Sequence, residues 1–407
     1  MASTSLPVTL DDVVAAQELL SSIIRPTPLE FSGALSERVG GDVHLKCENL
    51  QRAGSFKIRG AYTRMSRLSD EEKARGVVAA SAGNHAQGVA LAAQLLGIKS
   101  TIFMPLGAPI PKLNATRAYG AEVEQLGTSI DECLVRAKQF EAETGAVLIH
   151  PFDHADIVAG QGTCGLEILE QCPDVKTILV SVGGGGLLAG IATAVKAKQP
   201  DVRVVGVQAE MAAAYPPSLA AGRPVPLTSM ATMADGIAVG CPGEVPYAIV
   251  RELVDSIETV SEESLSRALL FLLERAKLLV EPAGAAAVAR LLDTGPQTYE
   301  GPVVAVLSGG NIDPLLLLRI VRYGLAAAGR YLQFRVRVSD SPGSLAGLLA
   351  DLAGADANVL EIEHVRTAAT LQVHEVEVAV QLEAKGSAHC DEILRALRDK
   401  GYPVSFG

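Results

Sequence analysis

The 407-residue sequence contains no tryptophan, and aromatic residues make up only 4% of it. This scarcity argues against a surface that stacks on nucleic-acid bases or sugars. No run of about 18 uninterrupted apolar residues is present, which a membrane-spanning helix would need. Basic stretches are also absent, and 35 Lys and Arg against 46 Asp and Glu give a net charge of −11. We therefore expect no nucleic-acid partner and no membrane partner.

The six cysteines form no CxxC pair and no short pairing pattern, so they are predicted to be reduced residues of a cytoplasmic protein. The N-terminus MASTSLPVTL has no basic region followed by an apolar run, and we expect no signal peptide. The content of 48% hydrophobic and 20% charged residues is that of a globular chain. At about 150 residues per domain, the length predicts two to three domains.

Helical and strand patterns alternate along most of the chain. A helix is predicted at 13–24, after an N-terminal cap at Thr9, Asp11 and Asp12, and a buried strand is predicted at 302–310. Two βαβ units are each predicted from an apolar run, a helical stretch and a second apolar run: 76–81, 88–97 and 100–105, then 177–182, 187–199 and 202–210. Runs this apolar are typical of parallel strands covered on both faces. The pattern predicts a doubly wound α/β enzyme with two lobes.

The pattern changes near residue 328, where strands begin to alternate apolar and polar residues. The predicted elements are a strand at 330–340, a turn and helix at 341–354, strands at 358–366 and 371–383, a helix at 391–401 and a strand at 402–406. This order, β-α-β-β-α-β, predicts a ferredoxin-like unit. We therefore place two domains at residues 1–328 and 329–407.

The segment SFKIRGA (55–61) carries a single lysine. Lys57 lies between Phe56 and Ile58, and apolar neighbours disfavour the charged form of an amine. An uncharged lysine can condense with an aldehyde to form a Schiff base. A surface lysine whose stem packs over apolar neighbours would give the same local pattern, so this segment alone leaves both interpretations open.

Four consecutive glycines follow a predicted strand and precede a predicted helix: Gly183, Gly184, Gly185 and Gly186. Without Cβ atoms, their backbone N–H groups can curve around a phosphate, and the helix N-terminus adds a favourable dipole. Gly184, Gly186 and Ala189 also match the dinucleotide fingerprint, with Glu210 near the expected ribose-binding acid. A plain tight turn is the structural alternative. Four glycines exceed what either alternative needs, which favours a phosphate site.

The segment SAGNHAQGVA (81–90) is predicted to be a loop that runs into a helix. Ser81, Asn84 and His85 place a hydroxyl, an amide and an imidazole beside free helix N–H groups, which together can hold a carboxylate. Helix capping by Ser81 or Asn84 is the structural alternative. In two further segments, LSGGN presents Ser308 after a strand, and EPAGA places Glu281 before a helix, where it either caps the helix or lines the site.

These segments occur in a fixed order together with MADG (233–236). Over roughly residues 10–325 the sequence thereby resembles the pyridoxal-phosphate (PLP) enzymes related to threonine dehydratase and serine racemase, and the ordered set is far more specific than any single motif. The tail, through its SPGSL turn (341–345) and NVLEIEHVR strand (358–366), resembles an ACT domain, a small amino-acid-sensing module. This is the layout of threonine ammonia-lyases with one regulatory module.

The resemblance implies a catalytic domain of PLP fold type II (tryptophan synthase β-like), with a smaller lobe inserted at roughly residues 50–155, and pyridoxal 5'-phosphate as cofactor. It implies that Lys57 and Ser81 are catalytic, and that Ser81, Asn84 and His85 bind the carboxylate of an amino acid substrate. Ser308 would meet the pyridine nitrogen and leave it neutral, which suits an elimination. The implied cofactor-binding residues are Phe56, Lys57, Asn84, Gly183, Gly184, Gly185, Gly186, Leu187 and Ser308.

Two positions depart from the racemase pattern. Serine racemases carry a second serine where this chain has Ala82, so we expect poor racemisation. They also bind a divalent ion through a set in which Glu210 and Ala214 match but Pro216 replaces an aspartate. Proline has no side-chain oxygen, so no divalent metal is predicted, and Glu210 and Ala214 are only weak candidates.

The tail is predicted to bind an amino acid effector through Pro342, Gly343, Ser344 and Leu345, because glycine lets backbone N–H groups approach a carboxylate. A purely structural dimerisation module is the alternative. We expect a homodimer or a homotetramer.

The predicted function is deamination of L-threonine to 2-oxobutanoate and ammonia, and also of L-serine to pyruvate, under regulation by the tail. A serine racemase, a β-replacement synthase, a Rossmann oxidoreductase and a non-catalytic amino-acid sensor stay open as alternatives.

Overall fold

The computed structural model describes residues 6–366 and 371–406 of a chain that divides into two units, Met1–Pro314 and Leu315–Gly407. Helix α14 (Pro314–Ala327) falls in the second unit apart from its first residue. The boundary predicted at residues 328/329 lies at the other end of this helix. Of the helices in the described residues, none has the length and apolar character needed to cross a membrane.

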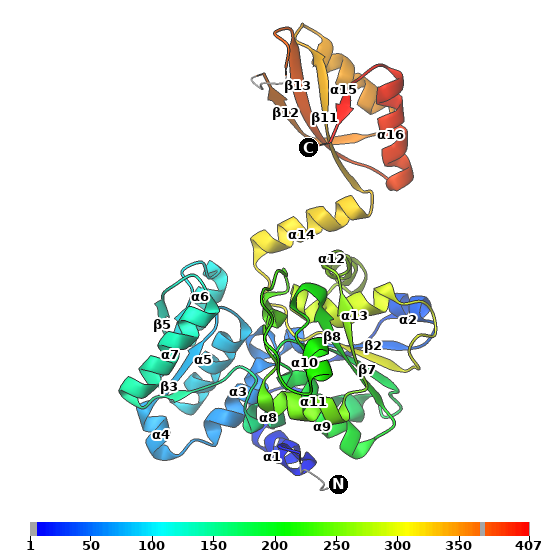
Figure 1. Cartoon of the computed structure of the whole chain (residues 1–407). Helices are drawn as coiled ribbons and strands as arrows, with labels where there is room; N and C mark the ends of the chain where they lie inside the picture. Colours follow the sequence, from blue (N-terminus) through cyan, green and yellow to red (C-terminus); the bar gives the residue numbers. More distant parts are fainter. Residues whose placement is uncertain (1–5, 367–370, 407) are drawn as a thin grey trace. The chain divides into compact units, whose positions relative to one another are not determined.

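The first unit contains two sheets in separate lobes (Figure 1). The larger sheet has the order β1 (Leu29–Phe31), β2 (Val43–Lys46), β10 (Val303–Val306), β7 (Thr177–Ser181), β8 (Arg203–Ala209), β9 (Ser256–Val260). Its strands are parallel except β1. The smaller, all-parallel sheet has the order β5 (Glu122–Gln125), β4 (Ser100–Met104), β3 (Val77–Ala80), β6 (Val147–Leu148). The α/β prediction is confirmed.

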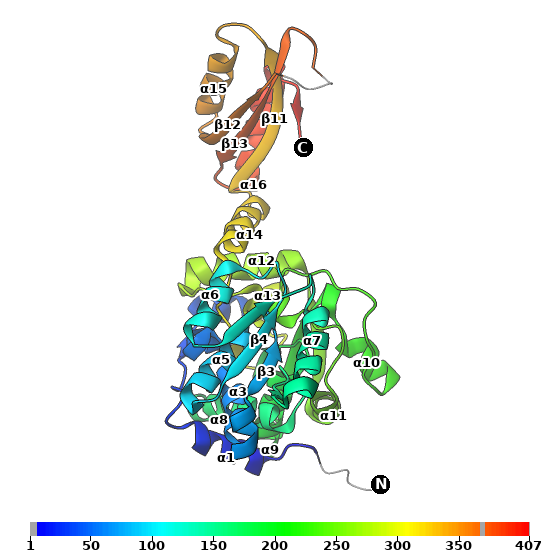
Figure 2. The ribbon, with the colours of Figure 1, turned by 90° about the vertical axis from the view of Figure 1, so that its left-hand side faces the viewer.

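Helices cover these sheets. They are α1 (Leu10–Leu20), α2 (Gly33–Val39), α3 (Lys57–Ser66), α4 (Asp70–Arg75), α5 (Asn84–Leu96), α6 (Ile110–Ala118), α7 (Ile130–Thr144), α8 (Ala155–Gln171), α9 (Gly186–Lys198), α10 (Tyr215–Ala221), α11 (Glu244–Leu253), α12 (Glu262–Phe271) and α13 (Pro282–Asp293). Helices α5 and α7 flank β3 and β4 on opposite sides (Figure 2). Every residue of β3, β4, β7 and β10 is buried, as expected of strands covered on both faces.

Two predicted helices differ from the structure in their extent. The helix predicted at 13–24 spans Leu10–Leu20, because Thr9 and Asp12 form a capping box three residues earlier than the apolar pattern suggests. The helix predicted at 88–97 begins at Asn84 with Gly83 as its N-cap. The helix therefore begins inside the polar segment 81–87, where the sequence has no apolar periodicity that would predict a helix.

Helix α3 is fixed against α8 by close packing and buried charge. A Cβ atom on Gly60 would lie 2.7 Å from the Ile157 carbonyl oxygen, so only glycine permits this crossing. Next to it, the buried Arg59 pairs with Glu48 at 2.7 Å and with Glu167 at 2.6 Å. Loss of one partner would leave an uncompensated buried charge, so the pairing strongly specifies this arrangement. The first residue of α3 thus has a defined position.

The second unit contains one antiparallel sheet in the order β12 (Asn358–Val365), β13 (Glu375–Glu383), β11 (Tyr331–Ser339), β14 (Val404–Ser405). Helices α15 (Ser344–Gly354) and α16 (Ser387–Asp399) complete the predicted β-α-β-β-α-β order, which is confirmed. Phe334, Val336 and Val338 are buried on alternate positions of β11, as its pattern predicted. Helix α16 begins four residues before the predicted 391, and the strand predicted from 371 begins at Glu375.

Candidate active site

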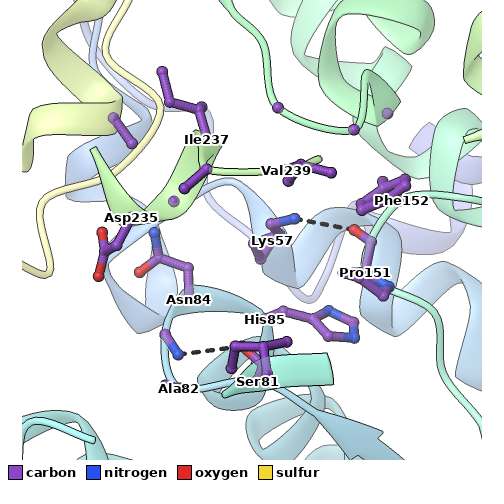
Figure 3. Close-up of a pocket in the computed structure, with 18 of the residues that line it drawn as sticks. Lys57, Ser81, Ala82, Asn84, His85, Pro151, Phe152, Asp235, Ile237 and Val239 are labelled. Atoms are coloured by element: carbon purple, nitrogen blue, oxygen red, sulfur yellow. Dashed lines mark hydrogen bonds between the residues drawn. The ribbon is translucent and has the colours of Figure 1, made fainter. Parts of the chain in front are cut away.

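A cavity of about 500 Å³ in the first unit brings together segments that are far apart in the sequence (Figure 3). The carboxyl ends of β3, β7 and β10 and the N-termini of α3, α5 and α9 meet there, as is usual for ligand sites in parallel α/β folds. All the predicted catalytic, cofactor-binding and substrate-binding residues line this cavity: Phe56, Lys57, Ser81, Asn84, His85, Gly183, Gly184, Gly185, Gly186, Leu187 and Ser308.

Lys57 is the first residue of α3, and its amine points into the cavity. Its Nζ donates a hydrogen bond to the Pro151 carbonyl at 3.0 Å and lies 5.1 Å from the centre of the Phe56 ring (Figure 3). Burial lowers the pKa of Lys57 to about 8, although the charge of Glu281 opposes this shift. The Phe56 N–H donates to the Ser308 carbonyl at 3.2 Å, which ties the start of α3 to the end of β10. A lysine lying on the outer surface is therefore ruled out.

The loop of residues 183–186 is packed so closely that side chains cannot be accommodated. A Cβ atom on Gly184 would lie 2.4 Å from the Phe152 ring, and one on Gly185 would lie 1.8 Å from the Tyr215 hydroxyl. Gly185 also has a backbone φ of +98°, a value that residues other than glycine rarely adopt. A plain turn would not need this packing at consecutive positions. The loop leads directly into α9, whose first N–H groups have no partner within the helix and can bind an anion.

Ser308 forms a hydroxyl pair that the sequence did not reveal. Ser181, at the end of β7, donates from its Oγ to the Oγ of Ser308 at 2.9 Å, and both side chains are buried. Because Ser308 accepts this bond, its own proton is free to be donated into the cavity. No local signal marks Ser181, since it lies 127 residues before its partner.

Asn84 is held by two neighbours at the start of α5. Its Nδ2 donates to Glu281, and its Oδ1 accepts from Asn311 at 2.8 Å. One amide hydrogen of Asn84 is left for a ligand. Burial and, to a lesser extent, the charge of Asp235 raise the pKa of Glu281 to about 7, so this carboxyl titrates near neutral pH.

Lys112 is a second cavity lysine, which the sequence did not reveal because nothing in its surroundings on α6 stands out. Its Nζ pairs with Asp235 at 2.7 Å, so it joins the smaller lobe to the MADG segment. A Cβ atom on Gly83 would lie 3.8 Å from this amine. Lys112 thus lies beside the N-terminus of α5, with its charge paired to Asp235.

Ser81 and His85 use part of their hydrogen-bonding capacity within the protein itself. The Ser81 hydroxyl accepts from the Gly83 N–H at 3.1 Å. Gly83 is itself the N-cap of α5 and no side chain caps this helix, so the structural alternative of capping by Ser81 or Asn84 is not found. The His85 Nε2 lies 2.7 Å from the Ile149 carbonyl, and burial lowers the pKa of His85 to about 3. The ring is therefore neutral and donates to Ile149. The group of His85 that can still donate to a carboxylate is therefore its backbone N–H.

Gln161 on α8 is another cavity residue that the sequence did not mark. It is 1% exposed, and its Oε1 has no hydrogen-bond partner among the described residues. Unpaired polar atoms of this kind are costly in a protein interior, and such a group next to a cavity indicates that something else satisfies it.

The weak metal candidates lie apart from this cavity. Glu210 belongs to a short 3₁₀ helix (Glu210–Ala212) and is exposed, and Ala214 is buried two residues further on. Neither residue lines the cavity. Within residues 6–366 and 371–406, no group of three or more His, Cys, Asp or Glu is arranged to hold a metal ion.

The second unit has its own hollow of about 320 Å³ at the turn between β11 and α15. The four predicted effector residues line it: Pro342, Gly343, Ser344 and Leu345. His364 and Arg366 line it as well, and Arg366 pairs with Asp340 at 3.3 Å. These two basic side chains lie at the end of β12, so the sequence of the turn gave no sign of them.

Comparisons with known proteins agree with this geometry. The family model described as pyridoxal-phosphate dependent enzyme matches residues 20–309. An L-threonine ammonia-lyase of Thermotoga maritima is 46% identical over 398 residues, which cover 98% of this chain and 99% of the relative. A solved threonine deaminase from T.th. has a TM-score of 0.70 and 44% identity over 75% of this chain and 99% of its own. The solved structure of maize serine racemase has a TM-score of 0.74 and 36% sequence identity, and the match covers 79% of this chain and 99% of the racemase chain.

The chain belongs to the family of pyridoxal-phosphate dependent enzymes, with their fold type II catalytic domain. Its cofactor is pyridoxal 5'-phosphate, and within the family it groups with the L-threonine ammonia-lyases. The residues present fit this cofactor. The side-chain-free loop at 183–186 suits a phosphate, Lys57 offers an amine of lowered pKa, and Ser308 offers a free hydroxyl proton.

Proposed function

We propose that this enzyme deaminates L-threonine to 2-oxobutanoate and ammonia. One observation carries the proposal: the shielded amine of Lys57 shares a cavity with the glycine loop 183–186 and with the N-terminus of α5. Deamination needs a base, a phosphate anchor and a carboxylate anchor at these three places. The 46% identity to an L-threonine ammonia-lyase over nearly the whole chain supports the same reaction.

When bound, pyridoxal phosphate supplies an aldehyde that takes up an amine and a ring that draws electrons from the substrate Cα. Lys57 is placed to remove the Cα proton, and its pKa of about 8 leaves part of the amine neutral at neutral pH. The proton moves from Cα to Nζ, and the β-hydroxyl leaves as water with a proton that the cofactor phosphate would supply. The released enamine then takes up one water and hydrolyses to 2-oxobutanoate and ammonia. Because the cavity shields Lys57, the amine keeps a lower pKa than it would have in water.

The other predicted residues hold the reactants. The N–H groups of residues 183–187 would hold the phosphate, and the free amide hydrogen of Asn84 would be donated to the cofactor's 3-oxygen. Ser308, oriented by Ser181, would donate to the pyridine nitrogen without charging it. Ser81 and the first N–H groups of α5 bind the substrate carboxylate, while Phe56 packs beside the ring.

Racemisation is disfavoured by the residue beside Ser81. Ala82 lines the cavity and has no proton to deliver to the opposite face of Cα. L-Serine, by contrast, lacks only the methyl group of threonine, and one such group changes kcat/KM by about 10- to 200-fold. We therefore include slower conversion of L-serine to pyruvate in the proposal.

We further propose that the second unit is an ACT module that binds an amino acid at its hollow. The turn Pro342–Leu345 supplies backbone N–H groups, and Arg366 supplies a positive charge for a carboxylate. A homodimer or homotetramer and a cytoplasmic location are kept as predictions from the sequence.

The test is an assay of the purified holoenzyme with L-threonine and with L-serine. We expect 2-oxobutanoate and ammonia in equal amounts from threonine, slower pyruvate formation from serine, and no D-serine by chiral chromatography. Borohydride treatment is expected to fix the cofactor on the peptide that contains Lys57. A holoenzyme that forms no keto acid from threonine would refute the proposal.

A further inference from the structure

His150 lines the cavity next to the residue that accepts the Lys57 hydrogen bond. Its Nδ1 accepts hydrogen bonds from the backbone N–H of Asp153 at 2.8 Å and of Phe152 at 3.3 Å. Its ring meets the Phe152 ring edge-on, with centroids 4.7 Å apart at 89°. Because two donors point at Nδ1, this atom carries a lone pair, and the single proton of the neutral ring lies on Nε2.

The Nε2–H group is unused by the protein. Nothing in residues 6–366 or 371–406 accepts a hydrogen bond from it, although the residue lines the cavity. Burial lowers the pKa of His150 to about 4, and the charge of Lys57 is among the further causes. His150 in turn lowers the pKa of His85, after burial and Lys57. His150 also follows Ile149, whose carbonyl is bonded to His85 on α5, and precedes Pro151, whose carbonyl is bonded to Lys57. It therefore lies between the start of α5 and the base.

The charges around the cavity limit how a carboxylate can be bound there. None of the described residues in its wall is an arginine, and of its two lysines Lys57 is the base and Lys112 is paired with Asp235. The His85 ring is occupied by Ile149. A carboxylate has about four acceptor sites. A neutral donor from another segment can therefore add to the N–H groups at the start of α5.

We propose that His150 is a substrate-binding residue whose Nε2–H donates a hydrogen bond to the carboxylate of the bound amino acid, across from the N–H groups at the start of α5. This inference rests on the proposed function, because it assigns a residue to the carboxylate of the same substrate. The backbone bonds at Nδ1 hold the ring in place, so the donor is fixed before the substrate arrives.

Two substitutions separate this role from a structural one. His150→Asn places an acceptor near the position of Nδ1, so it keeps the bonds from Phe152 and Asp153 but loses the donor. His150→Gln reaches to the position of Nε2 and keeps a donor there. For His150→Asn we expect KM for L-threonine to rise about 10- to 100-fold with little change in kcat, as for one lost bond to a charged group. His150→Gln is expected to recover most of that loss.

A ligand without a carboxylate gives a second readout. Binding of 1-amino-2-propanol, followed by the absorbance of the holoenzyme, should have the same affinity in wild type and in His150→Asn. His374→Asn, at an exposed position of the second unit, is the matched control and should leave both measurements unchanged.

These experiments distinguish a failure of the His150 proposal from a failure of the proposed function. If the wild-type enzyme forms no 2-oxobutanoate, the proposed function fails before His150 is tested. If the wild type is active and His150→Asn keeps its KM, or weakens binding of 1-amino-2-propanol equally, the carboxylate contact is refuted. A loss of cofactor absorbance or of melting temperature in His150→Asn, at an unchanged KM per holoenzyme, would make the ring structural and also overturn the inference.

Discussion

The two units build their hollows from similar elements but enclose them differently. In the first unit the strands that end at the cavity are buried along their whole length, whereas none of the eight residues of β12 in the second unit is fully buried. The first cavity is lined by residues from the lobes of both sheets, and burial there shifts the pKa of Lys57 and of Glu281 towards neutrality. The second hollow is formed at one turn of a sheet. Enclosure is thus what converts ordinary side chains into reactive ones.

The comparison also predicts where substitutions matter. The first cavity depends on contacts between segments more than a hundred residues apart, such as Ser181 with Ser308. The second depends mainly on the turn Pro342–Leu345 and on Arg366. Substitutions in the first unit should therefore abolish chemistry, and those in the second should tune the response to an effector.

The largest effect is expected for Lys57→Ala. Removing the amine removes the base for the Cα proton, so 2-oxobutanoate formation should fall by about 10³-fold or more. The rate of keto-acid formation measures this directly. The matched control is Lys99→Ala, because Lys99 is exposed and only pairs with Glu122 at the surface. If Lys57→Ala turned over threonine within about tenfold of wild type, Lys57 would not be the base.

The next effect concerns the glycine loop. Gly185→Ala would force a Cβ atom onto the Tyr215 hydroxyl at a strained φ, so the dissociation constant for PLP should rise about 100-fold. Titration of apoenzyme with PLP, followed by absorbance, measures it. Gly222→Ala is the matched control, since Gly222 also has positive φ (+69°) but has nothing within 4 Å of a Cβ atom. Equal losses in both variants would mean that strain, not the contact with Tyr215, determines the affinity.

Replacing the buried carboxyl of Glu281 is expected to shift the pH dependence of kcat. The pKa of Lys57 is lowered to about 8, and below that pH the amine is protonated and cannot accept a proton, so kcat at saturating threonine should rise with pH around a midpoint near 8. The charge of Glu281 raises the pKa of Lys57. Glu281→Gln should therefore move the midpoint of this rise in kcat to lower pH. A midpoint that moved to higher pH, or did not move, would show that the charge of Glu281 does not raise the pKa of Lys57.

The smallest effect is expected in the second unit. Arg366→Ala removes a cation from the hollow and should raise the effector concentration for half-maximal response about tenfold. Threonine turnover at increasing isoleucine or valine measures this response. Arg335→Ala is the control, because Arg335 pairs with Glu377 on the sheet and does not line the hollow. An identical response in both variants would place effector binding elsewhere.

Much of the fold and site could be predicted because the signals are local. The buried strands β3 and β7 appear as short apolar runs, and the alternation in β11 marks a half-exposed strand. The predicted cofactor and substrate residues lie in short segments whose composition is unusual, and all of them line one cavity. The cap at Thr9 was predicted and is confirmed, whereas the start of α5 was less predictable, since its N-cap Gly83 lies outside the apolar pattern.

The sequence by itself determined the two kinds of unit, the glycine loop at 183–186 and the lysine at 57 among apolar residues, because periodicity, glycine runs and apolar neighbours are properties of adjacent residues. Only the tertiary structure decided that Ser181, Lys112, His150 and Gln161 share the cavity, that the His85 ring is occupied by Ile149, and that Glu281 titrates near neutral pH. The physical reason is that hydrogen-bond partners and burial depend on segments that folding brings together. The residues next to a side chain in the sequence do not reveal which segments these are.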